Sequence, residues 1–182
     1  MRDIAIIDAF PVHDCQKKVL TVGCGEGRIE YQLAERGCKV FATDIEEQEA
    51  WCNVKYLTND NLGFYRSDIF DLSSFPIKSS PIVICSQVLE HLSNYKLALI
   101  HLLALTEVRL IITVPHRTSF KSPDHINFWD DTYSRAIFKD IDEFVTICHP
   151  YSTTISKILT KPQDAGKQYG YLIIVDKRQK LQ

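Results

Sequence analysis

Residues 18–27 read KVLTVGCGEG, and this stretch decides the fold class. The apolar run 18–22 is typical of a buried strand, and the glycines that follow it indicate a tight turn. Ile29 and Leu33 then lie four residues apart, on one face of a helix that Gly37 can end. The stretch therefore predicts a strand, a glycine-rich turn and a helix in succession.

The same alternation of short apolar runs and helical patterns continues along the chain. Further strands are expected at 39–43, 63–66, 81–85, 108–114, 144–148 and 169–175, and helices at 46–53, 89–106 and 132–142. This order is typical of βαβ units, in which parallel strands are joined by helices. It predicts an α/β, Rossmann-like sheet of seven strands, mainly parallel, with helices on both faces and the last strand antiparallel.

A length of 182 residues favours one domain. We expect a short N-terminal appendage at 1–17, a cofactor-binding core at 19–115, and an acceptor-side loop with the C-terminal strands at 116–182. The formal net charge of -2 gives no basic field for nucleic acid. No apolar run reaches the ~18 residues of a membrane span, and no export signal is visible, so a cytoplasmic protein is expected.

Six cysteines are present, at 15, 24, 38, 52, 85 and 148. They form no Cys-x-x-Cys pair and show no matching histidine spacing. The sequence therefore predicts neither a disulfide framework nor a metal site.

Polar or flexible residues follow the predicted strands where ligands bind in an open α/β sheet, beyond the carboxyl ends. Gly23 and Gly25 would let backbone amides approach a ligand, and Asp44 is placed to accept hydrogen bonds from ribose hydroxyls. Asp68 ends the third strand. Position 28 is Arg, so the third glycine of the dinucleotide fingerprint is missing, which disfavours a pyrophosphate site.

Four motifs occur in order, each at the end of a predicted strand: VLTVGCGEG, VFATD, YRSDI and IVICSQVLEHL. With these motifs the sequence resembles the class I S-adenosylmethionine-dependent methyltransferases, specifically their broad type 11 group. The resemblance covers about 19–115. It implies S-adenosylmethionine as the cofactor and S-adenosylhomocysteine as the product.

The resemblance also implies roles for single residues. The glycine motif would pack against the methionine portion, Asp44 would hold the ribose, Asp68 and Ile69 would contact the adenine, and 86–88 would flank the sulfonium. The implied cofactor-binding set is Gly23, Cys24, Gly25, Gly27, Asp44, Ile45, Asp68, Ile69, Ser86, Gln87 and Val88.

This chain departs from the family pattern at several positions. Thr21 stands where an acid commonly orients the amino end of the cofactor, and Ser80 and Pro81 stand where Phe-Asp is usual. Gln87 occupies a position that is usually acidic or small and polar. These departures leave open a weakened or lost cofactor site.

The polar segment 116–131 follows the fifth predicted strand and is the candidate acceptor pocket. It contains His116, Asp124, His125, Asn127 and Trp129. His116 or His125 is the expected base if the acceptor is a hydroxyl. The alternative is a surface loop that only covers the sheet edge. For Glu90 and His91, at a predicted helix start, a structural role is slightly favoured.

The sequence thus predicts a methyltransferase that acts by direct displacement on a small-molecule or carrier-bound acceptor. The expected roof over the acceptor site is short, which fits a bulky acceptor or a partner subunit that completes the site. One alternative is a noncatalytic binding protein of the same fold. A less favoured alternative is an NAD-dependent oxidoreductase.

Overall fold

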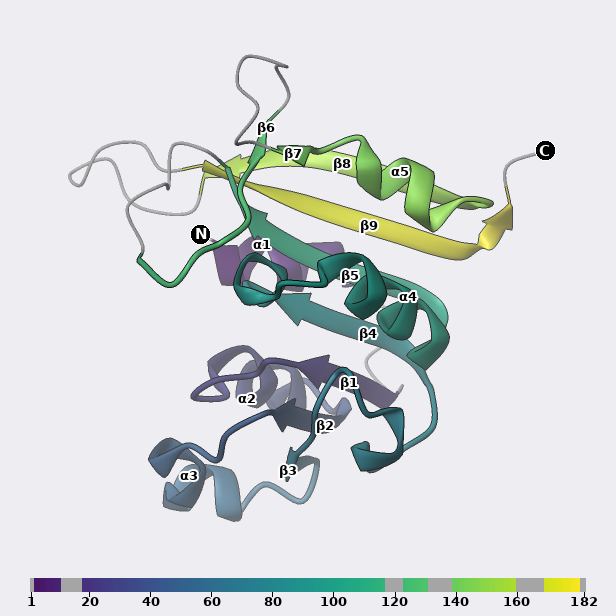
Figure 1. Ribbon diagram of the computed structural model, residues 1–182. Coiled ribbons are helices and arrows are strands. Elements are labelled where there is room, and N and C mark those ends of the chain that lie inside the picture. The colour runs from purple at the N-terminus through teal and green to yellow at the C-terminus, as the bar shows by residue number, and fades with distance from the viewer. Residues whose placement is uncertain (1, 11–17, 117–122, 131–138, 160–168, 181–182) are drawn as a thin grey trace.

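The computed structural model describes residues 2–10, 18–116, 123–130, 139–159 and 169–180. Its central feature is a seven-stranded sheet with the order β3-β2-β1-β4-β5-β9-β8 (Figure 1). The strands are β1 (Lys18–Val22), β2 (Lys39–Asp44), β3 (Leu62–Arg66), β4 (Ser80–Ser86), β5 (Thr106–Pro115), β8 (Tyr151–Leu159) and β9 (Tyr169–Lys180). Only β9 runs antiparallel to its neighbours, so the predicted fold class is confirmed.

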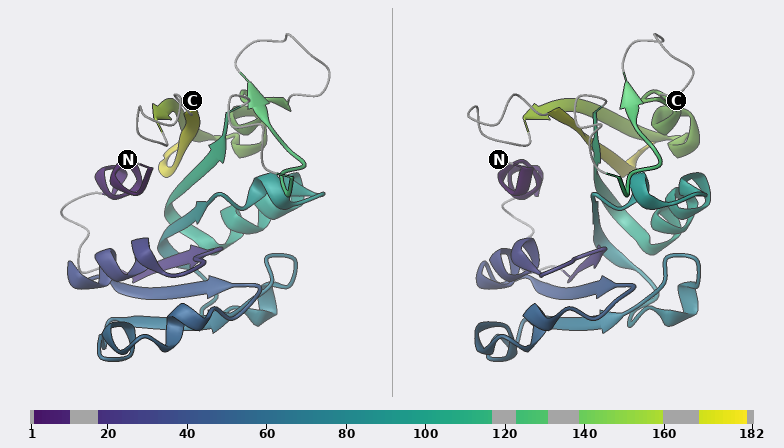
Figure 2. Two further views of the ribbon diagram at one scale, coloured as in Figure 1. Left: turned by 90° about the vertical axis from the view of Figure 1, so that its left-hand side faces the viewer. Right: turned by 60° about the vertical axis from the view of Figure 1, so that its left-hand side comes forward.

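Helices cover both faces of this sheet (Figure 2). One face carries α1 (Arg2–Ala9), α2 (Arg28–Glu35) and α3 (Val54–Leu57), and the other carries α4 (Tyr95–Leu105) and α5 (Glu143–Cys148). Short 3-10 helices occur at Glu49–Cys52, Leu72–Ser74 and Leu89–His91, and a separate parallel pair is formed by β6 (Trp129–Asp130) and β7 (Lys139–Asp140).

The alternation of side chains along the strands divides the interior into two cores. Val19 belongs to the core beneath α2, whereas Leu20 belongs to the core beneath α4 and α5, and both side chains are fully buried. Because the sheet is buried on both faces, its central strands are apolar at nearly every position.

Helix α1 packs against the domain. Ile6 and Phe10 are buried in the same core as Val19, and the helix contacts α2, β8 and β9. Residues 2–10 of the expected N-terminal appendage thus pack against the rest of the domain. Residues 11–17 lie outside the described part of the chain.

The strand expected at 144–148 is wrong, because these residues form α5. The β-branched residues of this segment favour a strand locally. Phe144 and Cys148 are both buried against α4 and the sheet, and their spacing of one helical turn brings them to one face. Tertiary packing thus overrides local propensity.

The sixth strand of the sheet is β8, where the sequence predicts no strand. Its serines and threonines, which are half-exposed or exposed, hide the alternation that identifies a strand. The helix expected at 132–142 is wrong for its last part, because Lys139–Asp140 forms the strand β7. Residues 131–138 lie outside the described part of the chain. The helix expected at 46–53 is only the 3-10 turn Glu49–Cys52.

No helix in the described part of the chain is both long and apolar enough to cross a membrane.

Replacing Phe144 tests the assignment of α5. Phe144 is fully buried and Val145 is 37% exposed. We expect Phe144→Ala to lower the free energy of unfolding by about 3–5 kcal/mol, through lost burial and an unfilled cavity. Val145→Ala should cost less than about 1 kcal/mol. Chemical denaturation followed by circular dichroism measures both, and equal losses would contradict the assigned face.

Candidate functional site

A cavity of about 750 Å³ opens at the carboxyl ends of β1, β2 and β4. Ten of the eleven residues expected to bind cofactor line it: Gly23, Cys24, Gly25, Asp44, Ile45, Asp68, Ile69, Ser86, Gln87 and Val88. The remaining one, Gly27, is not among the lining residues and lies against the ring of Phe64. The volume suits a nucleotide-sized ligand, since small-molecule pockets span roughly 300–1,000 Å³.

The glycine turn has backbone geometry that other residues adopt poorly. Gly23, Gly25 and Gly27 have φ of 75°, 52° and 79°, in the left-handed region. A Cβ on Gly23 would lie 2.1 Å from a methyl carbon of Val88, whereas a Cβ on Gly25 would meet no atom within 4 Å. Gly23 therefore permits close packing between two cavity walls, and Gly25 leaves its backbone open to a ligand.

Asp44 ties the glycine turn to the end of β2. Its Oδ2 accepts a hydrogen bond from the Gly25 amide and its Oδ1 accepts one from the Ile45 amide, both at 2.8 Å. The Trp51 indole donates to the Gly25 carbonyl at 2.8 Å and so fixes the turn from the other side. Asp44 is only half-buried, which leaves its carboxylate accessible to hydroxyl groups in the cavity.

Asp68 shapes the next part of the wall. Its Oδ1 accepts from the Phe70 amide at 2.8 Å, and its own amide donates to the Ser74 hydroxyl at 2.9 Å. These bonds place the buried side chain of Ile69 and the 40% exposed ring of Phe70 on the cavity surface. An apolar wall beside a carboxylate is suited to a heteroaromatic ring that carries an amino group.

The backbone bends sharply after β4. Gln87 has a φ of 59°, unusual for a residue with a side chain. Its amide donates to the Thr113 carbonyl at 3.0 Å, and Ser86 and Thr113 share a hydroxyl hydrogen bond of 2.8 Å. Bonding to β5 holds this strained bend, and such strain often occurs at functional sites.

Glu30 is a cavity residue that the sequence analysis did not identify. It lies in the first turn of α2, is 3% exposed, and lines the cavity together with Thr21 and Asp3. Burial raises the pKa of Glu30 to about 7, an effect to which Asp3 and Asp44 add, while the backbone amide and the Thr21 hydroxyl act in the opposite direction. In the sequence, the only signal for Glu30 was its position about one helical turn after the glycine motif.

The two histidines expected as bases lie in different surroundings. His116 is 3% exposed, its Nε2 lies 3.5 Å from Oδ1 of Asp130, and its ring meets the edge of Tyr171. It does not line the cavity. His125 does not line the cavity either, but it stands beside His91, which does, with 4.8 Å between ring centroids. Burial and the neighbouring His91 lower the pKa of His125.

The rest of the expected acceptor segment is partly structural. Asn127 is buried, and its side-chain amide donates to the carbonyls of Leu89 and Leu92 at 2.9 and 2.7 Å. Trp129 is fully buried between the rings of Tyr95 and Phe144. Residues 117–122 of this segment lie outside the described part.

Comparison with known proteins agrees with this geometry. Residues 20–105 match the family model of the methyltransferase domain. Over 79 residues the chain is 33% identical to the ubiquinone biosynthesis O-methyltransferase of Rickettsia bellii, a match that covers 42% of this chain and 32% of that protein. The chain spans about a third of the length of the curated relatives that it matches.

Solved structures share the whole architecture. A methyltransferase from Archaeoglobus fulgidus superposes with a TM-score of 0.67 at 18% identity, covering 97% of this chain and 93% of that one. Magnesium protoporphyrin IX methyltransferase from Synechocystis, crystallised with bound S-adenosylhomocysteine, gives a TM-score of 0.67 at 20% identity, with coverage of 96% and 83%. Residues 20–105 of this chain thus resemble the methyltransferase domain, and the sheet has the fold of these solved methyltransferases.

Proposed function

We propose that the chain is an S-adenosylmethionine-dependent methyltransferase that acts on a small-molecule acceptor. The observation that carries the proposal is the convergence of ten expected cofactor-binding residues on one cavity at the carboxyl edge of the sheet. The cofactor would supply an electrophilic methyl group, which an acceptor nucleophile takes by direct displacement with sulfur as the leaving group.

The residues of the cavity fit the parts of this cofactor. Asp44 offers a half-exposed carboxylate for ribose hydroxyls, and Asp68 with Ile69 offers a carboxylate and an apolar wall for adenine. Such hydrogen bonds to charged groups contribute about 1.5–3 kcal/mol each.

Glu30 compensates, in our proposal, for the acid that is missing at position 21. It lies beside Thr21, so its carboxylate is next to the position where the family pattern has an acid. An ionised Glu30 would stabilise the ammonium group of the methionine portion. Arg28, on the same helix turn and the same cavity, is available for the carboxylate of that portion.

The chemistry asks little of the protein beyond alignment, because holding nucleophile, methyl group and sulfur in line provides much of the acceleration. The bend at Gln87 and the Val88 side chain would set the position of the sulfonium end. His125 remains a candidate for handling the proton of a hydroxyl acceptor. The buried pairing of His116 with Asp130 favours a structural role for that histidine.

Calorimetric titration of the purified chain with S-adenosylmethionine, S-adenosylhomocysteine and NAD tests this proposal. We expect binding of both sulfur ligands in the micromolar range, about -8 kcal/mol. Asp44→Ala should weaken it at least about tenfold, because it removes the ribose partner and loosens the turn.

Glu47→Ala is the matched control for this titration, because Glu47 is an exposed acid that does not line the cavity. It should bind like the wild type. Preference for NAD would identify an oxidoreductase instead. No heat with either sulfur ligand would favour a noncatalytic protein that binds another partner.

The role of Glu30 predicts a pH dependence. Since its pKa is about 7, Glu30 gains its negative charge between pH 6 and 8. We expect affinity for S-adenosylmethionine to rise several-fold over this interval in the wild type. In Glu30→Gln the affinity should be weaker at pH 8 and nearly independent of pH. An unchanged pH profile in the variant would refute the assignment.

Glu30→Gln should also be more stable than the wild type at high pH. A carboxyl whose folded pKa is raised from 4.5 to about 7 stabilises the fold fully below pH 4.5 and loses this contribution as the pH rises through 7. Glu30→Gln removes this loss, so its free energy of unfolding at pH 8 should exceed that of the wild type by up to about 3 kcal/mol. Denaturant titration at pH 5 and pH 8 measures the difference.

A further inference from the structure

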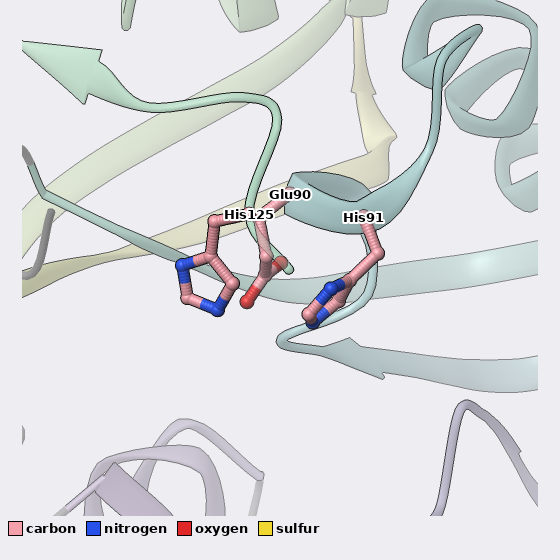
Figure 3. A group of neighbouring side chains, drawn as sticks. All are labelled: Glu90, His91 and His125. Carbon is pink, nitrogen blue, oxygen red and sulfur yellow. The ribbon is translucent and has the colours of Figure 1, made fainter. Parts of the chain in front are cut away.

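Glu90, His91 and His125 form a compact cluster at the rim of the cavity. Each offers one potential ligand atom, and these atoms all lie within 4.8 Å of one another. Glu90 and His91 belong to the 3-10 helix after β4, and His125 comes from the segment after β5. Figure 3 shows the Glu90 carboxylate between the two imidazole rings.

The spacing fits a single metal ion. Metal–ligand distances of about 2.0–2.2 Å allow two ligand atoms on one ion to be separated by at most about 4.4 Å. Small rotations of the exposed His91 and half-exposed His125 side chains would close the remaining gap. Two imidazoles with one carboxylate are a recurrent ligand set for divalent first-row transition metals.

The hydrogen bond at His91 orients that ring as a ligand. Its Nδ1 lies 3.0 Å from the carbonyl oxygen of Asp124. A carbonyl only accepts, so Nδ1 carries the proton and the Nε2 lone pair is available to a metal in the neutral ring. Metal-binding histidines typically donate their second N–H to a carbonyl or carboxylate in this way.

Backbone hydrogen bonds hold the segment that carries Glu90 and His91 against the segment that carries His125. The amides of Ile126 and Asn127 donate to the Glu90 carbonyl at 2.8 and 3.0 Å. The Asn127 side chain adds bonds to the carbonyls of Leu89 and Leu92. The main chain on either side of the cluster is therefore held in place by hydrogen bonds, as a precise metal site requires.

His91 connects the cluster to the proposed reaction centre. His91 and Leu92 line the same cavity as Gln87 and Val88. Glu90 is fully buried, and a bound cation stabilises a carboxylate at such a depth. An ion held by three protein ligands keeps open coordination positions for substrate.

We propose that Glu90, His91 and His125 bind one divalent first-row transition-metal ion, which holds an acceptor with two adjacent oxygen atoms. The proposal rests on the methyltransferase function and specifies its acceptor class. Coordination favours loss of the hydroxyl proton to solvent water, so His125 acts here as a ligand in place of the proton-accepting role considered above. The oxygen then forms the new bond to the methyl carbon, while the bond from that carbon to sulfur breaks and its electron pair stays on sulfur.

Manganese binding tests the site without any turnover. The chelator-treated chain is titrated with Mn²⁺, and the loss of the free-ion signal is followed by electron paramagnetic resonance, in the absence of S-adenosylmethionine. We expect one ion per chain. His91→Ala and His125→Ala should each weaken binding at least about tenfold, a typical cost of losing one ligand.

Two further variants complete the test. Glu90→Gln should also weaken Mn²⁺ binding, and circular dichroism reports whether it folds. If Glu90→Gln does not fold, His91→Ala still decides the test, because His91 is exposed and its replacement should leave the fold intact. His149→Ala removes an exposed histidine at the end of α5, away from the cluster, and should bind Mn²⁺ like the wild type.

Absence of a bound ion, or binding that His91→Ala and His125→Ala leave unchanged, would overturn the metal site. Titration of the same samples with S-adenosylhomocysteine separates this failure from failure of the proposed function. Intact cofactor binding without manganese binding removes only the metal site. Once the ion is shown, methyl transfer to a catechol and to its mono-hydroxyl analogue tests the acceptor class. Transfer to the catechol alone would support the two-oxygen acceptor, and equal transfer to both would contradict it.

Discussion

The candidate site depends on the hydrogen bond from the Gly25 amide to Asp44. It joins the turn after β1 to the end of β2, where the amides of Gly23 and Cys24 also donate to the Thr43 carbonyl. Parallel pairing in register brings these strand ends to one edge, and the left-handed glycines then turn the chain away from it. The cavity is the space that this turn leaves open.

The opposite wall is held by a second set of constraints. The bend at Gln87 is bonded to Thr113 of β5, and its neighbour Val88 packs where Gly23 has no side chain. This close approach couples the glycine turn to the segment that carries Glu90 and His91. The proposed cofactor and acceptor regions therefore share one rigid frame.

Much of this frame could be predicted from the sequence, because it depends on local patterns. The apolar runs of β1, β2 and β4 are typical of buried strands, and the glycine turn, Asp44 and Ser86 mark their carboxyl ends. Parallel topology then brings the strand ends together. The segment at α5 could not be assigned in this way, since its helical state depends on burying Phe144 and Cys148 against other elements.

The place of Glu30 in the cavity and the grouping of His125 with Glu90 and His91 could not be predicted from the sequence, for one physical reason. Glu30 looks like an ordinary helix-start acid, and only the fold shows that its carboxylate is buried in the cavity wall beside Thr21. His125 lies far along the chain from Glu90, so no ligand spacing relates the two. Contacts between distant segments create both features.

A crystal structure of the chain with S-adenosylhomocysteine tests the central claim most directly. Our account predicts the ribose hydroxyls within hydrogen-bonding distance of Asp44, the adenine against Ile69 and Asp68, and the amino group facing Glu30. Density for the ligand outside this cavity, or in it with the adenine at Glu30, would contradict the account.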